Sequence, residues 1–269
     1  MPFDYIRARD AVHAVESLAA ADGFAKILAG GQSLGPMLNL RLAEPDLLVD
    51  VRTCPDLRGC NDDGESILYG AAVTHAEIED GVVPDPCHGW LAGAARRIAY
   101  RAVRNRGTIG GSIAHADPAA DWLVVLLLLG AEGLVLGHDG TRTATLAEFI
   151  TGPFSTTLDA GEVLVAIRVA RRSKGVRYGY RKTATKVGEF ASAFCVAMED
   201  PERGESRAVL GAIERPPIAI DDLSVVSDRT GAEAFVNSHV AGLDAPTVRL
   251  HAVTLLRAVR DIETAVPSA

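Results

Sequence analysis

The residues of this sequence that could bind a ligand are glycines and hydroxyl-bearing residues, which occur together in two short segments. The first segment, residues 29–35 (AGGQSLG), separates a stretch typical of a buried strand (25–29) from one typical of a helix (33–40). Glycine permits positive φ angles and a close backbone approach to a ligand, and the start of a helix attracts phosphate. Ser33 would add a hydroxyl donor. A tight turn with Ser33 as helix cap explains the same residues, so this segment alone leaves both interpretations open.

Two common nucleotide motifs do not fit the first segment. The Rossmann pattern requires one residue between its first two glycines, whereas Gly30 and Gly31 are adjacent. The Walker A pattern requires lysine and then serine or threonine after its last glycine. Gly30 and Gly35 have the required spacing, but Pro36 and Met37 follow. Neither a lysine for the γ-phosphate nor a hydroxyl for magnesium is present, so the segment is not typical of an ATPase.

The second segment, residues 104–112 (RNRGTIGGS), repeats the same chemistry. Gly110 and Gly111 are adjacent, Thr108 and Ser112 flank them, and we expect a glycine-rich loop with a helix some residues later. A dinucleotide suits two donor-rich loops better than a mononucleotide does, because its pyrophosphate presents oxygens on more than one side. The second segment therefore favours ligand binding over a pair of ordinary turns.

The sequence allows two interpretations of the role of Asp121. It can cap the apolar helix expected over residues 121–129, or its carboxylate can accept hydrogen bonds from the hydroxyls of a ribose. Both readings remain open from the sequence.

The elements that position these segments alternate between helix and strand in the first half of the chain. Asp10 is placed to cap a first helix, and Thr74 with Glu77 has the spacing of a capping box. We expect one helix over residues 89–103. The second half predicts successive strands at residues 163–169, 176–181, 190–198 and 208–213, followed by two helices. The last helix carries an apolar stripe at Val248, Ala252, Leu255, Val259 and Ile262. Together these patterns predict an α+β fold with a boundary at residues 171–175.

Composition excludes several classes of protein. The 269 residues carry 27 Lys+Arg and 35 Asp+Glu, a net charge of −8, which argues against a general nucleic-acid binder. The longest apolar run, residues 122–129, is too short to cross a bilayer, and no secretory signal is visible, so we expect a cytoplasmic protein with no membrane span. The four cysteines lack metal-ligand spacing, and no nucleophile elbow or carboxylate pair appears. The sequence therefore assigns no catalytic residue and no metal ligand.

The two glycine segments, in this order and at this separation, resemble the FAD-binding medium subunit of the molybdenum hydroxylases, the carbon monoxide dehydrogenase and xanthine dehydrogenase type. The matching stretches are residues 29–34, 104–112 and 116–121 (ADPAAD), with 3–5 and 70–75 also similar. The resemblance implies a two-subdomain FAD-binding domain, like that of vanillyl-alcohol oxidase (PCMH type), over residues 1–172. A C-terminal α+β domain with an antiparallel sheet and terminal helices would follow over residues 176–269.

The resemblance also implies positions for the cofactor. The two glycine segments should surround the pyrophosphate, Asp121 should contact the ribose or adenine end, and the backbone near Leu164 and a basic residue should lie closer to the isoalloxazine. Lys182 is our preferred match for that basic residue, with Arg181 and Lys186 as alternatives. The alternative interpretation is that Lys182 is a solvent-exposed lysine on a strand. The full set of predicted cofactor-binding residues is Ala29, Gly30, Gly31, Gln32, Ser33, Leu34, Thr108, Ile109, Gly110, Gly111, Ser112, Asp121, Leu164 and Lys182.

For function, the resemblance implies an electron-transfer oxidoreductase subunit that holds FAD. A large molybdopterin subunit and a small subunit with [2Fe–2S] clusters would be its partners, in a dimer of heterotrimers, and an external acceptor would take the electrons. The alternatives are a stand-alone FAD oxidoreductase of the same flavin fold and a non-catalytic nucleotide-binding assembly module. The arginines at positions 96, 97, 101, 104 and 106 are read as a solvated helix face, or else as a surface for a partner or phosphate.

Overall fold

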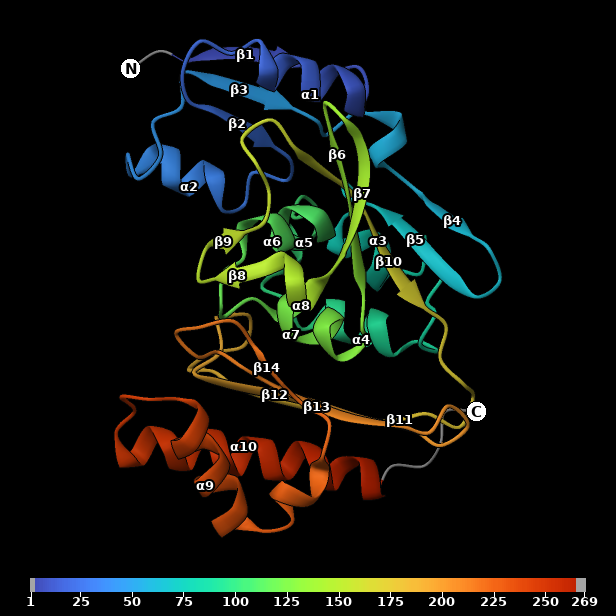
Figure 1. The fold of residues 1–269 in the computed structure, drawn as a ribbon, viewed down its shortest axis with the longest axis vertical. Coiled ribbons are helices and arrows are strands. Elements are labelled where there is room, and N and C mark those ends of the chain that lie inside the picture. The colour runs from blue at the N-terminus through green and yellow to red at the C-terminus, as the bar shows by residue number, and fades with distance from the viewer. Residues whose placement is uncertain (1–2, 265–269) are drawn as a thin grey trace.

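The computed structural model describes residues 3–264 and arranges them around successive sheets (Figure 1). The first sheet is parallel, in the order β1-β3-β2. It contains β1 (Asp4–Arg7), β2 (Ala25–Leu28) and β3 (Leu47–Asp50), with α1 (Ala11–Ala19) and α2 (Leu34–Asn39) as connecting helices. Asp10 caps α1 by accepting a hydrogen bond from the His13 N–H, as predicted.

The second sheet is antiparallel, in the order β4-β5-β10-β6-β7. Its strands are β4 (Cys60–Asp62), β5 (Ser66–Gly70), β6 (Glu132–Gly137), β7 (Gly140–Thr145) and β10 (Val163–Ala170). The short helix η1 (Pro55–Leu57) precedes it, and a small hairpin of β8 (Ile150–Gly152) and β9 (Ser155–Thr156) lies beside it. The helices between its strands are α3 (His75–Glu79), α4 (Trp90–Arg96), α5 (Arg101–Arg104), α6 (Ile109–His115), α7 (Asp121–Leu128) and α8 (Leu146–Phe149).

The third sheet, β11-β12-β13-β14, is also antiparallel. It contains β11 (Arg177–Thr183), β12 (Ala193–Asp200), β13 (Glu205–Gly211) and β14 (Ile218–Ile220). The chain then forms η2 (Leu223–Val226), α9 (Arg229–His239) and α10 (Ala245–Thr264), and the two α-helices cover the outer side of the sheet (Figure 1). All five residues of the predicted stripe on the last helix are buried, which confirms that stripe. The expected α+β fold is likewise confirmed.

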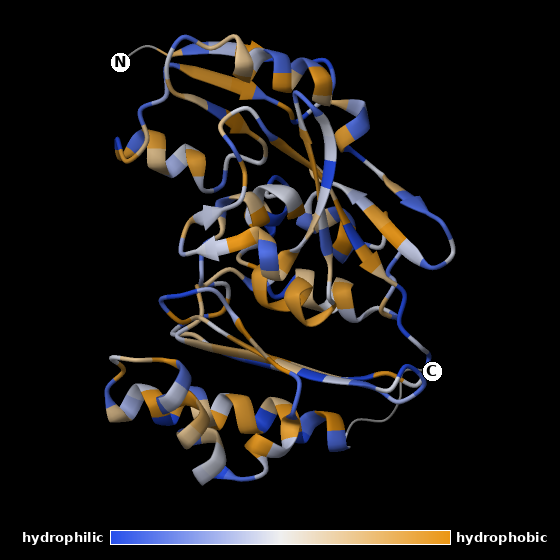
Figure 2. Ribbon diagram, in the orientation of Figure 1, coloured by the Kyte–Doolittle hydropathy of each residue, from blue (hydrophilic) through white to orange (hydrophobic). Residues whose placement is uncertain are grey.

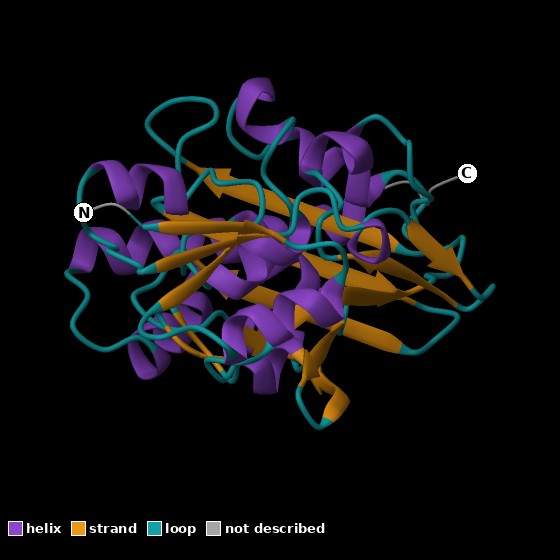
Figure 3. Ribbon diagram, turned by 90° about the horizontal axis from the view of Figure 1, so that it is seen from above, coloured by secondary structure: helices purple, strands orange, loops and turns teal. Residues whose placement is uncertain are grey.

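Helix α7 lies between the second and third sheets and packs in the core that they share. All eight of its residues are buried, and the seven that follow Asp121 are apolar, as expected for a helix that is covered on every side (Figure 2). It packs against β12 and β13, and Gly211 lets the strand approach so closely that a Cβ there would lie 2.2 Å from a methyl of Val124. From above, the sheets lie over one another with helices between and around them (Figure 3). One apolar core therefore runs from the second sheet into the third.

Two local predictions were wrong. The helix expected over residues 89–103 is divided into α4 and α5, because Ala99 adopts a left-handed φ of 43° and ends the helical run. The expected loop at residues 107–111 is mostly helix, since Thr108 caps α6 and Gly110 and Gly111 lie in its first turn. The capping box of Thr74 and Glu77 is present as predicted.

Within residues 3–264, no helix combines the length and the hydropathy needed to cross a membrane.

Candidate functional site

The two glycine segments are in direct backbone contact. A Cβ on Gly30 would lie only 2.2 Å from the carbonyl oxygen of Arg106 and 2.7 Å from the Cα of Gly107. On the other side of the junction, a Cβ on Gly111 would lie 3.6 Å from the Cβ of Ala29. The absence of a side chain at Gly30 is therefore what allows the two segments to meet, whereas Gly111 and Ala29 lie at an ordinary van der Waals distance. They form one continuous backbone surface despite lying about eighty positions apart in the sequence.

The first segment has free hydrogen-bond donors. Within the described part of the chain, none of the backbone N–H groups from Gly30 to Leu34 has an acceptor in the protein. Gly31 has a φ of 72°, which glycine adopts without strain. The Ser33 hydroxyl does not cap α2, so the interpretation of this serine as a simple helix cap is wrong. The Gln32 amide turns back to the Gly30 carbonyl at 3.5 Å. A run of unsatisfied N–H groups is a suitable surface for an anion.

The second segment uses its N–H groups internally. Ile109 donates to the Val73 carbonyl at 2.9 Å, and Gly110 donates to the Ala71 carbonyl at 3.0 Å. The Thr108 hydroxyl accepts from the Gly111 N–H at 3.0 Å, which satisfies the first turn of α6. This segment therefore contributes close approach to the site, and its backbone offers few free donors.

A small apolar cavity lies where the segments meet. It has a volume of about 80 Å³ and is lined by Ala29, Gly110, Gly111 and Leu164, among others. Leu164 arrives from β10, at a point where the pairing of β10 with β6 shifts its register. Three stretches that the sequence assigned to the cofactor thus converge. The cavity itself is smaller than a flavin ring, since a cavity that holds benzene measures about 150 Å³.

Asp121 and Lys182 form a buried ion pair. The Lys182 Nζ lies 2.9 Å from both carboxylate oxygens of Asp121. The side chain of Lys182 is 11% exposed and that of Asp121 is 5% exposed. The Tyr180 hydroxyl donates to the same carboxylate at 2.7 Å. Burial, with Asp121 adding in the same direction, raises the pKa of Tyr180. On the other side of the Tyr180 ring, the guanidinium of Arg97 lies 4.4 Å from the ring centroid.

The structure differs from two expectations about Asp121, one about helix capping and one about its place along the cofactor. Asp121 does not cap α7, because Ala120 occupies the N-cap and Asp121 is the first helical residue. The sequence also assigned Asp121 and Lys182 to opposite ends of the cofactor, but two residues in contact cannot reach both ends of an extended dinucleotide. Those two assignments cannot both hold.

Strand geometry separates the basic candidates on β11. Tyr180 and Lys182 share the face towards α7, whereas Arg181 points to the opposite face and pairs with Asp261 of α10. Lys186 is exposed in the loop that follows β11. Of the three basic residues considered, only Lys182 is directed at the first turn of α7.

The basic run is only partly a solvated face. Arg104 is buried and donates to Glu79 at 2.6 Å and to the carbonyls of Ile98 and Ala99 at 2.9 Å each. Arg101 also pairs with Glu79, and the bond from Arg104 is the largest cause of the lowered pKa of the Glu79 carboxyl. For Arg104 the solvated interpretation is therefore wrong. Nothing in the local sequence marked Glu79 as the shared acceptor.

The surroundings of the first segment are positively charged. Lys26 on β2 and Arg106 beside Gly30 form no ion pair within residues 3–264. Burial lowers the pKa of His115, with Lys26 acting in the same direction and Asp117 against it. Unpaired cations beside unsatisfied N–H groups favour a phosphate-bearing ligand. The described residues contain no group of three or more His, Cys, Asp or Glu side chains arranged for a metal ion.

The fold and this backbone surface define a flavoprotein of the oxidoreductase class, as comparison with known proteins shows. Residues 1–171 match the family described as the FAD binding domain in molybdopterin dehydrogenase. The chain therefore belongs to that family, the flavin-binding subunits of the molybdenum hydroxylases.

Individual relatives agree with this membership. The chain is 36% identical over 196 residues to the carbon monoxide dehydrogenase medium chain of Hydrogenophaga pseudoflava, covering 73% of this chain and 68% of that one. It is 34% identical over 256 residues to the 6-hydroxypseudooxynicotine dehydrogenase complex subunit alpha of Paenarthrobacter nicotinovorans, covering 91% and 86%. The solved structure of the Hydrogenophaga pseudoflava carbon monoxide dehydrogenase aligns with a TM-score of 0.88 at 28% identity, over 98% of each chain.

Proposed function

We propose that this chain is the FAD-binding electron-transfer subunit of a molybdenum-containing hydroxylase or dehydrogenase complex in the cytoplasm. Its partners are a large molybdopterin subunit and a small subunit carrying [2Fe–2S] clusters, in a dimer of heterotrimers. The observation that carries the proposal is the run of free N–H groups from Gly30 to Leu34 against the closely packed second glycine segment. FAD, when bound, supplies the ability to take up electrons singly and to release them to an external acceptor.

The residues of this chain bind and orient the cofactor. The first glycine segment donates N–H groups to the pyrophosphate, and the second brings its backbone close enough to complete the cradle, with Ser33 and Ser112 as hydroxyl donors. Lys26 and Arg106 add positive charge beside it.

Lys182 and Asp121 act at the same end of the cofactor in this proposal, because they are in contact. We place this pair towards the isoalloxazine, where the lysine can stabilise negative charge on the reduced ring. Asp121 in turn holds the lysine, and Tyr180 holds the aspartate.

The division of labour along the chain follows the sheets. Residues 1–172 form the FAD-binding domain, in agreement with the family match over residues 1–171. Residues 176–269 form the C-terminal domain, whose strand β11 contributes Lys182 to the site. Relatives of this chain belong to a carbon monoxide dehydrogenase and to a 6-hydroxypseudooxynicotine dehydrogenase complex, so this type of subunit is compatible with different substrates.

The test is flavin stoichiometry in the purified chain. We expect an ultraviolet–visible spectrum of bound flavin and close to one FAD per chain after incubation with FAD. Gly111→Val should lose the flavin, because the new side chain meets the Thr108 hydroxyl and fills the junction. Gly93→Ala is the matched control, since a Cβ there has nothing within 4 Å. A chain that takes up no FAD, or a Gly111→Val chain that retains it, would contradict the proposal.

Substrate turnover by the isolated chain would instead identify a stand-alone oxidoreductase. Binding of ADP without FAD would identify an assembly module. Mass spectrometry of co-purifying proteins tests the expected partner subunits.

A further inference from the structure

Strand β1 forms an open edge of the parallel sheet. It pairs only with β3 among the described residues. Asp4 donates its N–H to the Asp46 carbonyl at 2.7 Å, and Ala8 donates to the Asp50 carbonyl at 2.9 Å. Successive residues of a strand direct their backbone groups to alternate sides. The N–H and C=O groups of Tyr5 and Arg7 therefore point away from β3, along the free edge.

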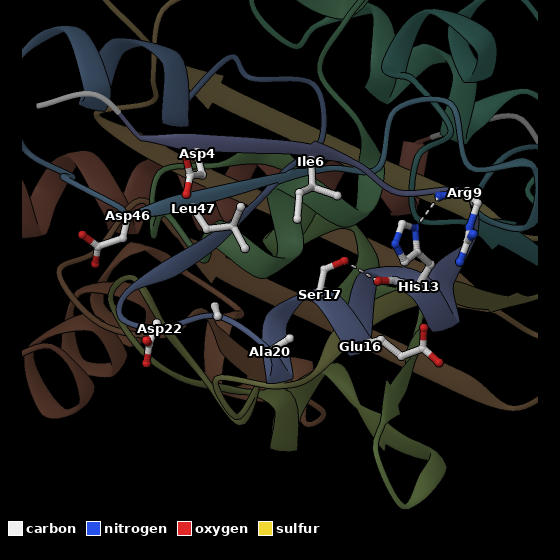
Figure 4. Close-up of a pocket in the computed structure, with 11 residues that line it drawn as sticks. Asp4, Ile6, Arg9, His13, Glu16, Ser17, Ala20, Asp22, Asp46 and Leu47 are labelled. Carbon is white, nitrogen blue, oxygen red and sulfur yellow. Dashed lines mark hydrogen bonds between the residues drawn. The ribbon is translucent and has the colours of Figure 1, made fainter.

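A groove runs beside this edge because α1 does not cover it. Helix α1 packs mainly against β2, β3, β6 and β10. Between β1 and α1 there remains a groove of about 580 Å³ (Figure 4). Ile6 and Leu47 line it from the sheet, and residues at helical spacing line it from α1: His13, Glu16, Ser17 and Ala20. A groove between an edge strand and a helix is the geometry in which proteins bind a peptide by strand addition.

The groove is strongly polarised. Three carboxylates, those of Asp4, Asp22 and Asp46, lie towards one end, whereas His13 and Arg9 lie at the other (Figure 4). Glu16 adds a fourth carboxylate on the helix side.

Three of these carboxylates are available to a ligand. Asp46 is already engaged, since it accepts the Phe24 N–H at 2.8 Å. Asp4, Glu16 and Asp22 are exposed, and within residues 3–264 their side chains make no hydrogen bond or ion pair. The charge that complements this groove is positive.

We propose that the free edge of β1 and the adjoining groove bind an extended basic segment of a partner polypeptide, which joins the sheet as a fourth strand. The backbone of the segment pairs with Tyr5 and Arg7. Every second side chain enters the groove, where one lysine or arginine meets Asp4 and another meets Glu16, which lies near His13 and away from Asp4 (Figure 4). The open edge provides the affinity through main-chain bonds, and the carboxylates select a basic sequence. This inference does not depend on the flavin site, because none of the lining residues belongs to the two glycine segments.

A synthetic peptide provides the direct test. The probe is a fluorescein-labelled peptide of about eight residues that alternates lysine and valine, and binding to the full chain is followed by fluorescence anisotropy. We expect saturable binding that weakens at high salt. A glutamate–valine peptide should not bind, and a lysine–valine peptide with N-methyl groups on its pairing edge should lose binding. Equal binding of the N-methylated peptide would overturn strand addition.

Variants of the chain separate backbone pairing from charge. Arg7→Pro removes one outward N–H and leaves the pairing with β3 intact, because proline is tolerated on an edge. Arg7→Val removes the same side chain but keeps that N–H, so it is the matched control. We expect loss of peptide binding in Arg7→Pro only.

The double variant Asp4→Asn, Glu16→Gln should weaken binding about fivefold, as expected for two exposed ion pairs. Thermal unfolding and FAD content show that each variant is folded. Equal affinity in Arg7→Pro and Arg7→Val would overturn the proposal. So would a concentration-dependent dimer that Arg7→Pro abolishes, since the occupant would then be a second copy of this chain.

Discussion

Gly30→Ala is the sharpest perturbation of the proposed cradle. The new Cβ would lie 2.2 Å from the Arg106 carbonyl oxygen, and that oxygen belongs to the backbone, which cannot rotate away. Gly30 has no positive φ, so alanine is not strained there by conformation and the whole effect is steric. A normal contact requires the two segments to separate by roughly 1 Å. Overpacking of this kind costs about 1–3 kcal/mol of stability, which lowers the Tm by about 5 °C in a chain of this size.

The effect on the cofactor should be larger than the effect on the fold. In the proposed site, separation of the segments would withdraw at least one N–H from the pyrophosphate, and a hydrogen bond to a charged group is worth about 1.5–3 kcal/mol. We therefore expect FAD affinity to fall about 10- to 100-fold. Flavin fluorescence titration of the flavin-free chain measures the affinity, and differential scanning calorimetry measures the Tm.

Gly35→Ala is the matched control for this experiment. Gly35 lies in α2, five residues further along, and a Cβ there would have nothing within 4 Å. Alanine in a helix is favoured over glycine by about 0.5–1 kcal/mol. This variant should keep its FAD and gain slightly in Tm. Wild-type FAD affinity in Gly30→Ala would refute the idea that contact between the segments creates the site.

Three further outcomes follow from particular side chains. Lys182→Met should destabilise the chain by about 3–5 kcal/mol in urea unfolding, because it leaves the buried Asp121 carboxylate without its cation, and adding Asp121→Asn should restore most of the loss. Burial lowers the pKa of His75 to about 3. Its neutral ring accepts from the Trp122 indole at 2.9 Å, so stability should be complete above pH about 6.5 and fall below it by up to about 1.4 kcal/mol per pH unit. His75→Gln should flatten that slope, and an unchanged slope would contradict the assignment. The native chain should react with one equivalent of a thiol reagent, at the exposed Cys60, and the denatured chain with four; rapid reaction of more than one native thiol would contradict the burial.

Elements with strong periodicity could be predicted from the sequence. The stripe on α10 and the apolar run of α7 each indicate how their helix is buried, and both patterns hold. Strand β12 is long and mostly apolar, and it lies close to its expected position, as do its neighbours β11 and β13. The proximity of the two glycine segments was also expected from the sequence, and the structure brings Gly30 against Arg106 and Gly107.

Other elements carry no such signal. Strand β4 is three residues long and fully exposed, so it has no alternation to detect. Ala99 ends α4 through its backbone conformation, although alanine ordinarily favours helix. No feature of the local sequence distinguishes Arg104 from the exposed arginines near it, but tertiary packing buries it against Glu79. Contacts between distant positions, such as Asp121 with Lys182, are likewise invisible to local patterns.

Glycine is required in the two segments for different physical reasons, although the two motifs look alike in the sequence. Gly31 is required by its positive φ and leaves its N–H free. Gly110 is required by packing, since a Cβ there would lie 2.4 Å from the Cβ of Ala71, and its N–H is already bonded. Gly110→Ala should therefore act first on the stability of α6 against β5, and on FAD only through that displacement. In the proposed site, the first segment would therefore supply hydrogen-bond donors, whereas the glycines of the second would allow close packing.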